Sequence, residues 1–212
     1  MDENNSDEES DNTAKMSTIS QHNFSDDSET ICISIVENMR EDYGLYVWPC
    51  SVILGEYVWQ QKQRFSEANV VELGAGTCLP GLVAAKVGAN VTLTDDSSRL
   101  EVLGLTWGVW DSSIFDLRPT IILGADVLYD SNAFDDLFAT VTFLLRNSPG
   151  STFITSYHNR SGHHLIEFLM RKWGLKCVKL LDGFSILPSF KASQLSGNIQ
   201  LVEMALMSKD NA

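Results

Sequence analysis

The sequence lacks any long apolar run, and this absence restricts the kinds of protein it can encode. A membrane-spanning helix needs about 20 consecutive apolar residues, so the sequence predicts none. The amino terminus is acidic and has no apolar stretch of the kind found in secretory signal peptides. We therefore expect a protein of the cytoplasm, the nucleus or both.

Cysteine is scarce, and its spacing favours neither a disulfide framework nor a zinc finger. The cysteines are Cys32, Cys50, Cys78 and Cys177. No two of them have C-x-x-C spacing, so we expect reduced thiols in the core or at the edge of a site. The histidines His158, His163 and His164 lie close together in the chain, but no cysteine or carboxylate joins them at ligand spacing. A surface helix start explains them better, and the sequence predicts no metal site.

Basic residues are few, and the negative charge is uneven. The formal net charge is −13, and residues 1–30 hold nine acidic residues and one lysine, which leaves −5 for the other 182 residues. Because no basic stripe is present, nucleic acid is an unlikely partner. We expect residues 1–30 to form a disordered acidic tail, either a solvated leader or a contact for basic partners such as histone tails. The length suits a single domain over residues 31–208.

Residues 70–81 are the most informative part of the sequence. Apolar residues lead into Glu72, Gly74 and Gly76 follow two residues apart, and a helix-like segment begins at Leu79. Glycines accept positive φ and carry no Cβ, so a ligand can lie against the backbone. A glycine turn after the first strand of an open α/β sheet is where nucleotides bind. The third glycine of the dinucleotide fingerprint is missing, because Leu79 stands in its place.

Further motifs follow in order along the chain. The next expected strand, residues 89–95, ends in Asp95 about 20 residues after the turn, where a carboxylate can bind ribose hydroxyls. Glu-Leu-Gly-Ala-Gly resembles motif I of the seven-strand, S-adenosylmethionine-dependent methyltransferases. Together with residues 42–49, 106–108 and 121–129, it resembles the family 16, lysine-methyltransferase-like group of protein methyltransferases. The resemblance covers roughly residues 31–206.

This resemblance implies a cofactor, S-adenosylmethionine, and a set of residues that hold it. Those residues are Trp48, Glu72, Gly74, Ala75, Gly76, Asp95 and Trp107. The three turn residues are expected to pass beneath the methionine part, while Glu72 is expected to orient the turn or, alternatively, to contact the ammonium group of the cofactor. Asp95 is the expected ribose ligand or, alternatively, a helix N-cap. Trp107 is expected either against the adenine or in the core, and the same alternatives hold for Trp48.

The resemblance also implies where the methyl acceptor binds. Asp126 and Tyr129 match the Asp-x-x-Tyr element of the family, and a carboxylate there can hold a cationic side chain and accept its proton. Asp126 could instead cap the following helix. Prolines that mark methyltransferases of nucleic-acid bases are absent, and a paired-glutamate loop typical of the main arginine methyltransferases is not recognisable. Tyr157, His158 and Arg160 are weaker candidates for the lining of a peptide groove.

We therefore expect a methyltransferase acting on a lysine or arginine side chain of a protein, such as a histone or another basic segment. Histone arginine and lysine in non-histone proteins are both candidate acceptors. The alternative is a catalytically impaired form that acts as a non-enzymatic adaptor through its surface or its acidic tail.

The expected fold is α/β, a Rossmann-like, doubly wound, mostly parallel sheet with one reversed strand. The expected strands of the sheet are residues 69–73, 90–94, 120–125, 151–157, 175–181 and 199–207, and the expected helices are residues 50–60, 79–87, 132–146 and 162–172. Residues 30–36 and 44–48 are expected to form a hairpin-like addition before this domain.

One strand is missing from this pattern. Ten residues separate Asp95 from Thr106, whereas a helix and a returning strand need about 20 or more. We predict an internal deletion between Leu103 and Gly104 that removes strand 3 and most of its preceding helix. The strand at residues 90–94 would then lie at the edge of the sheet.

Overall fold

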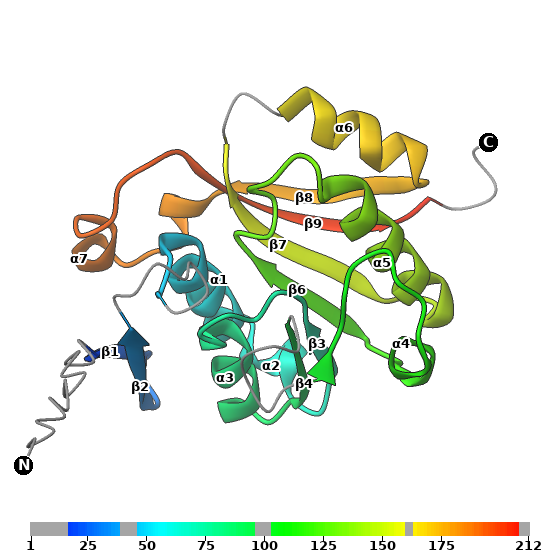
Figure 1. Cartoon of the computed structure of the whole chain (residues 1–212). Helices are drawn as coiled ribbons and strands as arrows, with labels where there is room; N and C mark the ends of the chain where they lie inside the picture. Colours follow the sequence, from blue (N-terminus) through cyan, green and yellow to red (C-terminus); the bar gives the residue numbers. More distant parts are fainter. Residues whose placement is uncertain (1–16, 39–45, 96–102, 160–162, 208–212) are drawn as a thin grey trace, which may run out of the picture.

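The computed structural model describes residues 17–38, 46–95, 103–159 and 163–207. Its centre is a seven-stranded sheet with the order β5-β4-β3-β6-β7-β9-β8, with helices on both faces (Figure 1). The strands of this sheet are β3 (Asn69–Glu72), β4 (Asn90–Asp95), β5 (Leu103–Gly104), β6 (Ile121–Ala125), β7 (Thr152–His158), β8 (Leu175–Asp182) and β9 (Ile199–Leu206). The helices are α1 (Pro49–Gln60), α2 (Lys62–Phe65), α3 (Leu79–Lys86), α4 (Ser112–Asp116), α5 (Phe134–Asn147), α6 (His163–Lys172), the 3₁₀-helix η2 (Gly183–Ser185) and α7 (Ser189–Ala192).

The sheet has the expected topology. Strands β5, β4, β3, β6 and β7 are parallel, and β9 is the one reversed strand, antiparallel to both of its neighbours. The chain runs outward from β3 to β5 and then returns to β6 on the other side of β3. The order of the strands therefore reverses between β3 and β6, and ligands of open α/β sheets bind at the carboxyl edge of such a point.

Alternating side chains of the strands fill two cores. Val70 of β3 packs with α1 and α3 on one face of the sheet, whereas Val71 packs with α5 and α6 on the other. Strand β6 divides in the same way, with Ile121 and Leu123 in the first core and Ile122 in the second. Strands buried on both faces read as continuous apolar runs, as the sequence of β6 does. The expected strands and helices of the sheet agree with the observed ones to within a residue or two at their ends.

The amino-terminal hairpin corrects two expectations. It pairs β1 (Ser17–Ser25) with β2 (Thr30–Asn38), so the expected disorder of residues 1–30 is wrong for the part from Ser17 onward. The expected strand at residues 44–48 is also wrong in its described part, since residues 46–48 are not in a strand. Alternating polar residues concealed β1, whose single buried side chain is Phe24.

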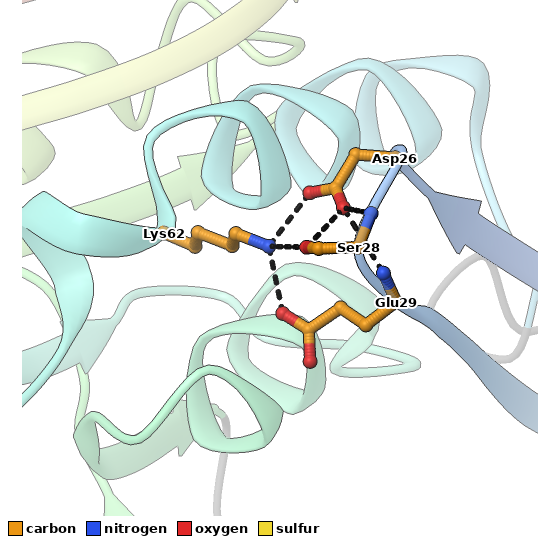
Figure 2. Close-up of polar contacts among 4 residues, drawn as sticks. All are labelled: Asp26, Ser28, Glu29 and Lys62. Atoms are coloured by element: carbon orange, nitrogen blue, oxygen red, sulfur yellow. Dashed lines mark hydrogen bonds and ion pairs between the residues drawn. The ribbon is translucent and has the colours of Figure 1, made fainter.

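Apolar burial and ion pairs attach this hairpin to the domain. The ring of Phe24 is fully buried and packs against α1 at Gly55, where an added Cβ would lie 3.2 Å from the ring. The turn of the hairpin binds Lys62 of α2 through Asp26 at 2.6 Å and Glu29 at 2.7 Å, as Figure 2 shows. Both acidic partners are exposed to solvent, so the ion pairs orient the turn, while the burial of Phe24, Ile33 and Ile35 in the core supplies most of the stabilisation.

The edge of the sheet also differs from the expectation. Strand β5 lies outside β4 and pairs with it in parallel through two residues, Thr94 with Leu103 and Asp95 with Gly104. The prediction that the strand at residues 90–94 is the edge is therefore wrong at its carboxyl end. The strand is nevertheless only two residues long, and the described pairing of β4 at residues 90–93 is with β3 alone. Residues 96–102, which include the expected helix remnant, lie outside the described residues.

We predict that Phe24→Ala lowers the free energy of unfolding by about 3–5 kcal/mol, the usual cost of removing a buried phenylalanine. Ile19→Ala is the matched control on the same strand, because Ile19 is 68% exposed and should change stability by less than about 0.5 kcal/mol. Urea unfolding of the three proteins measures both effects. Equal stability of the two variants would show that the hairpin is not part of the folded domain.

Candidate active site

The glycine turn after β3 has the conformation that its sequence predicts. Gly74 and Gly76 adopt positive φ of +58° and +50°. Adjacent strands hold the turn, because the N–H of Leu73 donates to Leu123 of β6 and the N–H of Ala75 donates to Thr94 of β4, both at 2.9 Å. The turn is thus fixed across the point where the strand order reverses.

Glu72 lies behind the turn and binds the start of the next helix. Its side chain is fully buried, and Oε2 accepts a hydrogen bond from the Gly81 N–H at 2.9 Å. An added Cβ at Gly81 would lie 2.4 Å from that oxygen, which explains the glycine. The second oxygen, Oε1, is buried and has no hydrogen-bond partner among the described residues. The contact with Gly81 joins Glu72 to the first turn of α3 and is consistent with a role in orienting the glycine turn.

Burial controls the ionisation of this carboxyl. Loss of solvent raises the pKa of Glu72 to about 8; the negative charge of Asp95 adds to the rise, and the bond from Gly81 opposes it. Burial likewise raises the pKa of the nearby Cys78 thiol to about 12, again with both carboxylates adding to the effect. Cys78 is therefore a protonated thiol at neutral pH and not a nucleophile.

Asp95 and Trp107 both meet the glycine turn. Asp95 Oδ2 accepts a hydrogen bond from the Gly76 N–H at 2.6 Å. An added Cβ at Gly74 would lie 3.2 Å from the ring of Trp107, so the ring rests against that glycine. The position of Trp107 is fixed from the next residue, because the Gly108 N–H donates to Thr140 of α5 at 2.9 Å. Four of the expected cofactor-binding residues are thus adjacent in space.

Asp126 follows β6 at the same carboxyl edge. It is about nine-tenths buried and has a positive φ of +54°, a conformation uncommon for residues other than glycine. Its N–H donates to the Ser156 carbonyl of β7 at 2.8 Å. Its Oδ1 is buried without a hydrogen-bond partner in the described part of the chain. A buried carboxylate oxygen of this kind favours a donor or a cation as its ligand.

The remaining site residues that the sequence analysis expected are Trp48, Tyr129, Tyr157 and Arg160. Trp48 is the N-cap of α1, half-buried, and its ring contacts Tyr46 edge to face at 5.5 Å. Tyr129 follows Asp126 but is 63% exposed. Tyr157 does not line a groove as expected: it is buried, and its hydroxyl donates to Gln200 at 3.1 Å. Arg160 lies outside the described residues.

Cys50, which the sequence analysis did not assign to the acceptor site, and His158, which it named only as a weaker candidate, lie beside Asp126. Ligand atoms of Cys50, Asp126 and His158 all lie within 4.8 Å of one another. His158 appeared in the sequence only as a weak groove candidate, and Cys50 only as a reduced thiol. No spacing pattern reveals such a group, because its members come from α1, the loop after β6 and the end of β7.

Known proteins resemble this chain in sequence. A family model described as lysine methyltransferase matches residues 27–106. Histone-arginine methyltransferase METTL23 of Xenopus laevis is 38% identical over 73% of this chain and 74% of its own length. The protein of the same name from Mus musculus is 35% identical over 83% of this chain and 78% of its own length. The chain belongs to the S-adenosylmethionine-dependent, lysine-methyltransferase-like family.

Solved structures support the fold of this methyltransferase. The CcbJ methyltransferase from Streptomyces caelestis superposes with a TM-score of 0.56 and 12% identity over 76% of this chain and 94% of its own. The glycopeptide N-methyltransferase MtfA complexed with sinefungin gives a TM-score of 0.53 and 11% identity over 72% of this chain and 94% of its own. At such low identity these likenesses establish the α/β methyltransferase fold alone.

Residues of this methyltransferase fit its cofactor, S-adenosylmethionine. The turn offers side-chain-free backbone at Gly74 and Gly76, Asp95 offers a carboxylate for hydroxyls, and Trp107 offers an aromatic ring. Asp95 already accepts one hydrogen bond, but a carboxylate has about four acceptor positions.

Among the described residues, no helix of the enzyme is long and apolar enough to cross a membrane.

We predict that Glu72→Gln makes the stability of the enzyme less dependent on pH. The folded carboxyl holds its proton up to about pH 8, whereas its ordinary pKa is 4.5. The unfolded chain thus binds fewer protons between these values, and the contribution of Glu72 to stability falls as pH rises from about 4.5 to about 8. Glutamine keeps an acceptor for Gly81 and cannot ionise.

Thermal melts at pH 5 and pH 9 test this prediction. The melting temperature of Glu72→Gln relative to the unmodified chain should rise from pH 5 to pH 9. Glu67→Gln, at an exposed position, should leave the pH dependence unchanged. The same pH profile in Glu72→Gln and the unmodified chain would contradict the raised pKa.

Proposed function

We propose that this chain transfers the methyl group of S-adenosylmethionine to a lysine or arginine side chain of a protein. The observation that carries the proposal is the buried Asp126 carboxylate, whose Oδ1 has no hydrogen-bond partner among the residues that the structure describes. It lies at the edge of the sheet where the glycine turn, Asp95 and Trp107 meet. A side-chain cation is the natural ligand of such an oxygen.

Each group at this edge has a distinct task in the proposed reaction. The bound sulfonium supplies an activated methyl group. Asp95 binds ribose hydroxyls and Trp107 packs against the adenine, so the methyl group has a fixed position. Asp126 binds the incoming cationic side chain and accepts its proton, because a protonated amine has no lone pair with which to attack. Positioning of the two reactants supplies most of the remaining rate.

Histone arginine is the acceptor that we propose to test first. Four relatives at 34–38% identity, from frog, mouse, rat and human, are named histone-arginine methyltransferase METTL23. A more distant relative, METTL21A of Mus musculus, is named a protein N-lysine methyltransferase and is 36% identical over 48% of this chain. The net charge of −13 favours a basic substrate such as a histone. This substrate would place the enzyme in the nucleus at least part of the time.

The short β5 supports a second candidate function. A strand of two residues gives the outer part of β4 little cover, and Trp107 follows directly after it. A chain with a weakened cofactor site would act as an adaptor through its surface or acidic tail. Isothermal titration with S-adenosylmethionine separates the two candidates, since saturable binding supports the enzyme and no binding supports the adaptor.

We predict that Asp126→Asn abolishes most methyl transfer while leaving cofactor affinity nearly unchanged. Asparagine tolerates the positive φ at this position, so the backbone is preserved. Loss of the proton acceptor should lower turnover about 10²–10⁴-fold. The assay uses radiolabelled cofactor with recombinant histones and with histones whose arginines are changed to lysine.

Asp116→Asn is the matched control, since Asp116 is exposed and lies near the opposite, amino-terminal edge of the sheet with Asn69 and Asn90. The control should keep full activity. Equal losses of cofactor binding and turnover in Asp126→Asn would make Asp126 a structural cap. Label that persists on arginine-free histones would move the acceptor to lysine.

We predict that Asp95→Asn weakens cofactor binding about 10–100-fold, the usual worth of a hydrogen bond to a charged group. The amide oxygen can still accept the Gly76 N–H, so the turn keeps its anchor. Titration calorimetry measures the affinity, and the melting temperature without cofactor serves as the control for folding. Unchanged affinity would remove Asp95 from the ribose site.

A further inference from the structure

We propose that Cys50, Asp126 and His158 form a zinc-binding site beside the position of the methyl acceptor. One ligand atom from each residue lies within 4.8 Å of the other two. Bond lengths of about 2.3 Å for Zn–S and about 2.0–2.2 Å for Zn–N and Zn–O place tetrahedral ligand atoms about 3.3–3.6 Å apart. Side-chain rotations that bring the atoms closer by about 1 Å therefore complete the site.

Hydrogen bonds among the three segments hold the ligands in place without a metal. Ser156 of β7 accepts the Asp126 N–H through its carbonyl at 2.8 Å, and its hydroxyl donates to the Cys50 carbonyl at 2.8 Å. His158 lies against Gly197, where an added Cβ would be 2.8 Å from the ring. Ser156 and Gly197 thus give the three ligands fixed starting positions.

The carboxylate supplies independent evidence for a ligand at this place. Asp126 is about nine-tenths buried, and its Oδ1 has no hydrogen-bond partner among the described residues. Burying an unsatisfied carboxylate oxygen costs free energy, which a bound cation recovers. The positive φ of Asp126 is a further sign that the protein holds this carboxylate in place against local strain.

The donor set selects the metal. Sulfur, imidazole nitrogen and carboxylate oxygen are the ligands that zinc prefers, whereas calcium and magnesium take oxygen ligands alone. Three protein ligands leave a fourth position for water or substrate. The burial of Cys50 and Asp126 limits the access of solvent to the ion.

Zinc and the methyl acceptor would compete for the same carboxylate. An ion on Asp126 removes the group that binds the substrate cation, so zinc should inhibit methyl transfer reversibly. Inhibition by zinc depends on the proposed function, whereas metal binding itself does not. The proposed metal site and the proposed function can therefore be refuted separately.

The test measures metal binding by the full chain after treatment with a chelator. Zn²⁺ affinity is determined by competition with a chromophoric chelator, and Co²⁺ serves as a spectroscopic substitute that shows a thiolate-to-metal charge-transfer band. We expect one tight site per chain with this band. Cys50→Ser should abolish the band, and Cys50→Ser or His158→Asn should weaken Zn²⁺ binding by more than about 100-fold, beyond the usual effect of changing an outer-shell partner.

Two variants serve as matched controls. Cys177→Ser removes an exposed thiol, and His164→Asn removes an exposed imidazole. Both should keep the tight site and the band. Equal Zn²⁺ affinity in Cys50→Ser and the unmodified chain, or no tight site in the unmodified chain, would overturn the proposal.

The same proteins give the inhibition measurement. The Zn²⁺ concentration for half inhibition, relative to the activity of each protein without metal, should rise in His158→Asn and stay unchanged in His164→Asn. A tight site in a chain that methylates no protein would refute the proposed function and leave the metal site intact. Methyl transfer by a chain with no tight metal site would refute the metal site and leave the proposed function intact.

Discussion

The hydrogen bond from the Gly81 N–H to the buried Glu72 carboxyl joins the end of β3 to the first turn of α3. The path of the glycine turn depends on this contact, because only six residues, 73–78, connect the strand to the helix. Because Gly74 and Gly76 have left-handed conformations, the turn needs an external anchor, and the buried carboxyl provides it. Burial raises the pKa of Glu72, so this anchor is a neutral carboxyl at neutral pH that still offers an acceptor to the Gly81 N–H.

Parallel strands gather the rest of the site at one edge. The carboxyl ends of β3, β4 and β6 and the segment that follows β5 meet there, so Asp95 and Trp107 reach the glycine turn although they are about 20 and 30 residues away from it. The loop after β6 brings Asp126 to the same edge, and β7 adds His158 beside it. The residues that we propose bind the cofactor at this edge thus lie on one side of the strand reversal, and Asp126, which we propose binds the methyl acceptor, lies on the other.

The amino-terminal hairpin and the short strand β5 both lie at the periphery of the seven-stranded sheet. The hairpin of β1 and β2 packs on α1 through Phe24 and covers apolar surface that would otherwise face solvent. At the edge of the sheet, β5 pairs with only the last two residues of β4. A short edge strand of this kind is one way in which proteins limit pairing with other chains.

Local sequence determined much of this protein. Apolar runs and the glycine turn placed each strand from β3 to β9 apart from β5, because buried parallel strands and left-handed glycines leave strong local signals. The one reversed strand of the sheet followed from the same pattern. The polar strand β1 left no such signal. Only one of its nine residues, Phe24, is buried, so its sequence has no alternation of apolar and polar residues that would indicate a strand.

Tertiary structure alone decided which segments that are distant in the sequence pair or contact one another. Strand β5 exists because Leu103 and Gly104 find the unpaired end of β4, and two residues carry no recognisable pattern of their own. Cys50, Asp126 and His158 come together only when α1 packs against the edge formed by β6 and β7. The sequence names residue types and local conformations, but the distances among side chains from three different elements arise from packing, which no local spacing records.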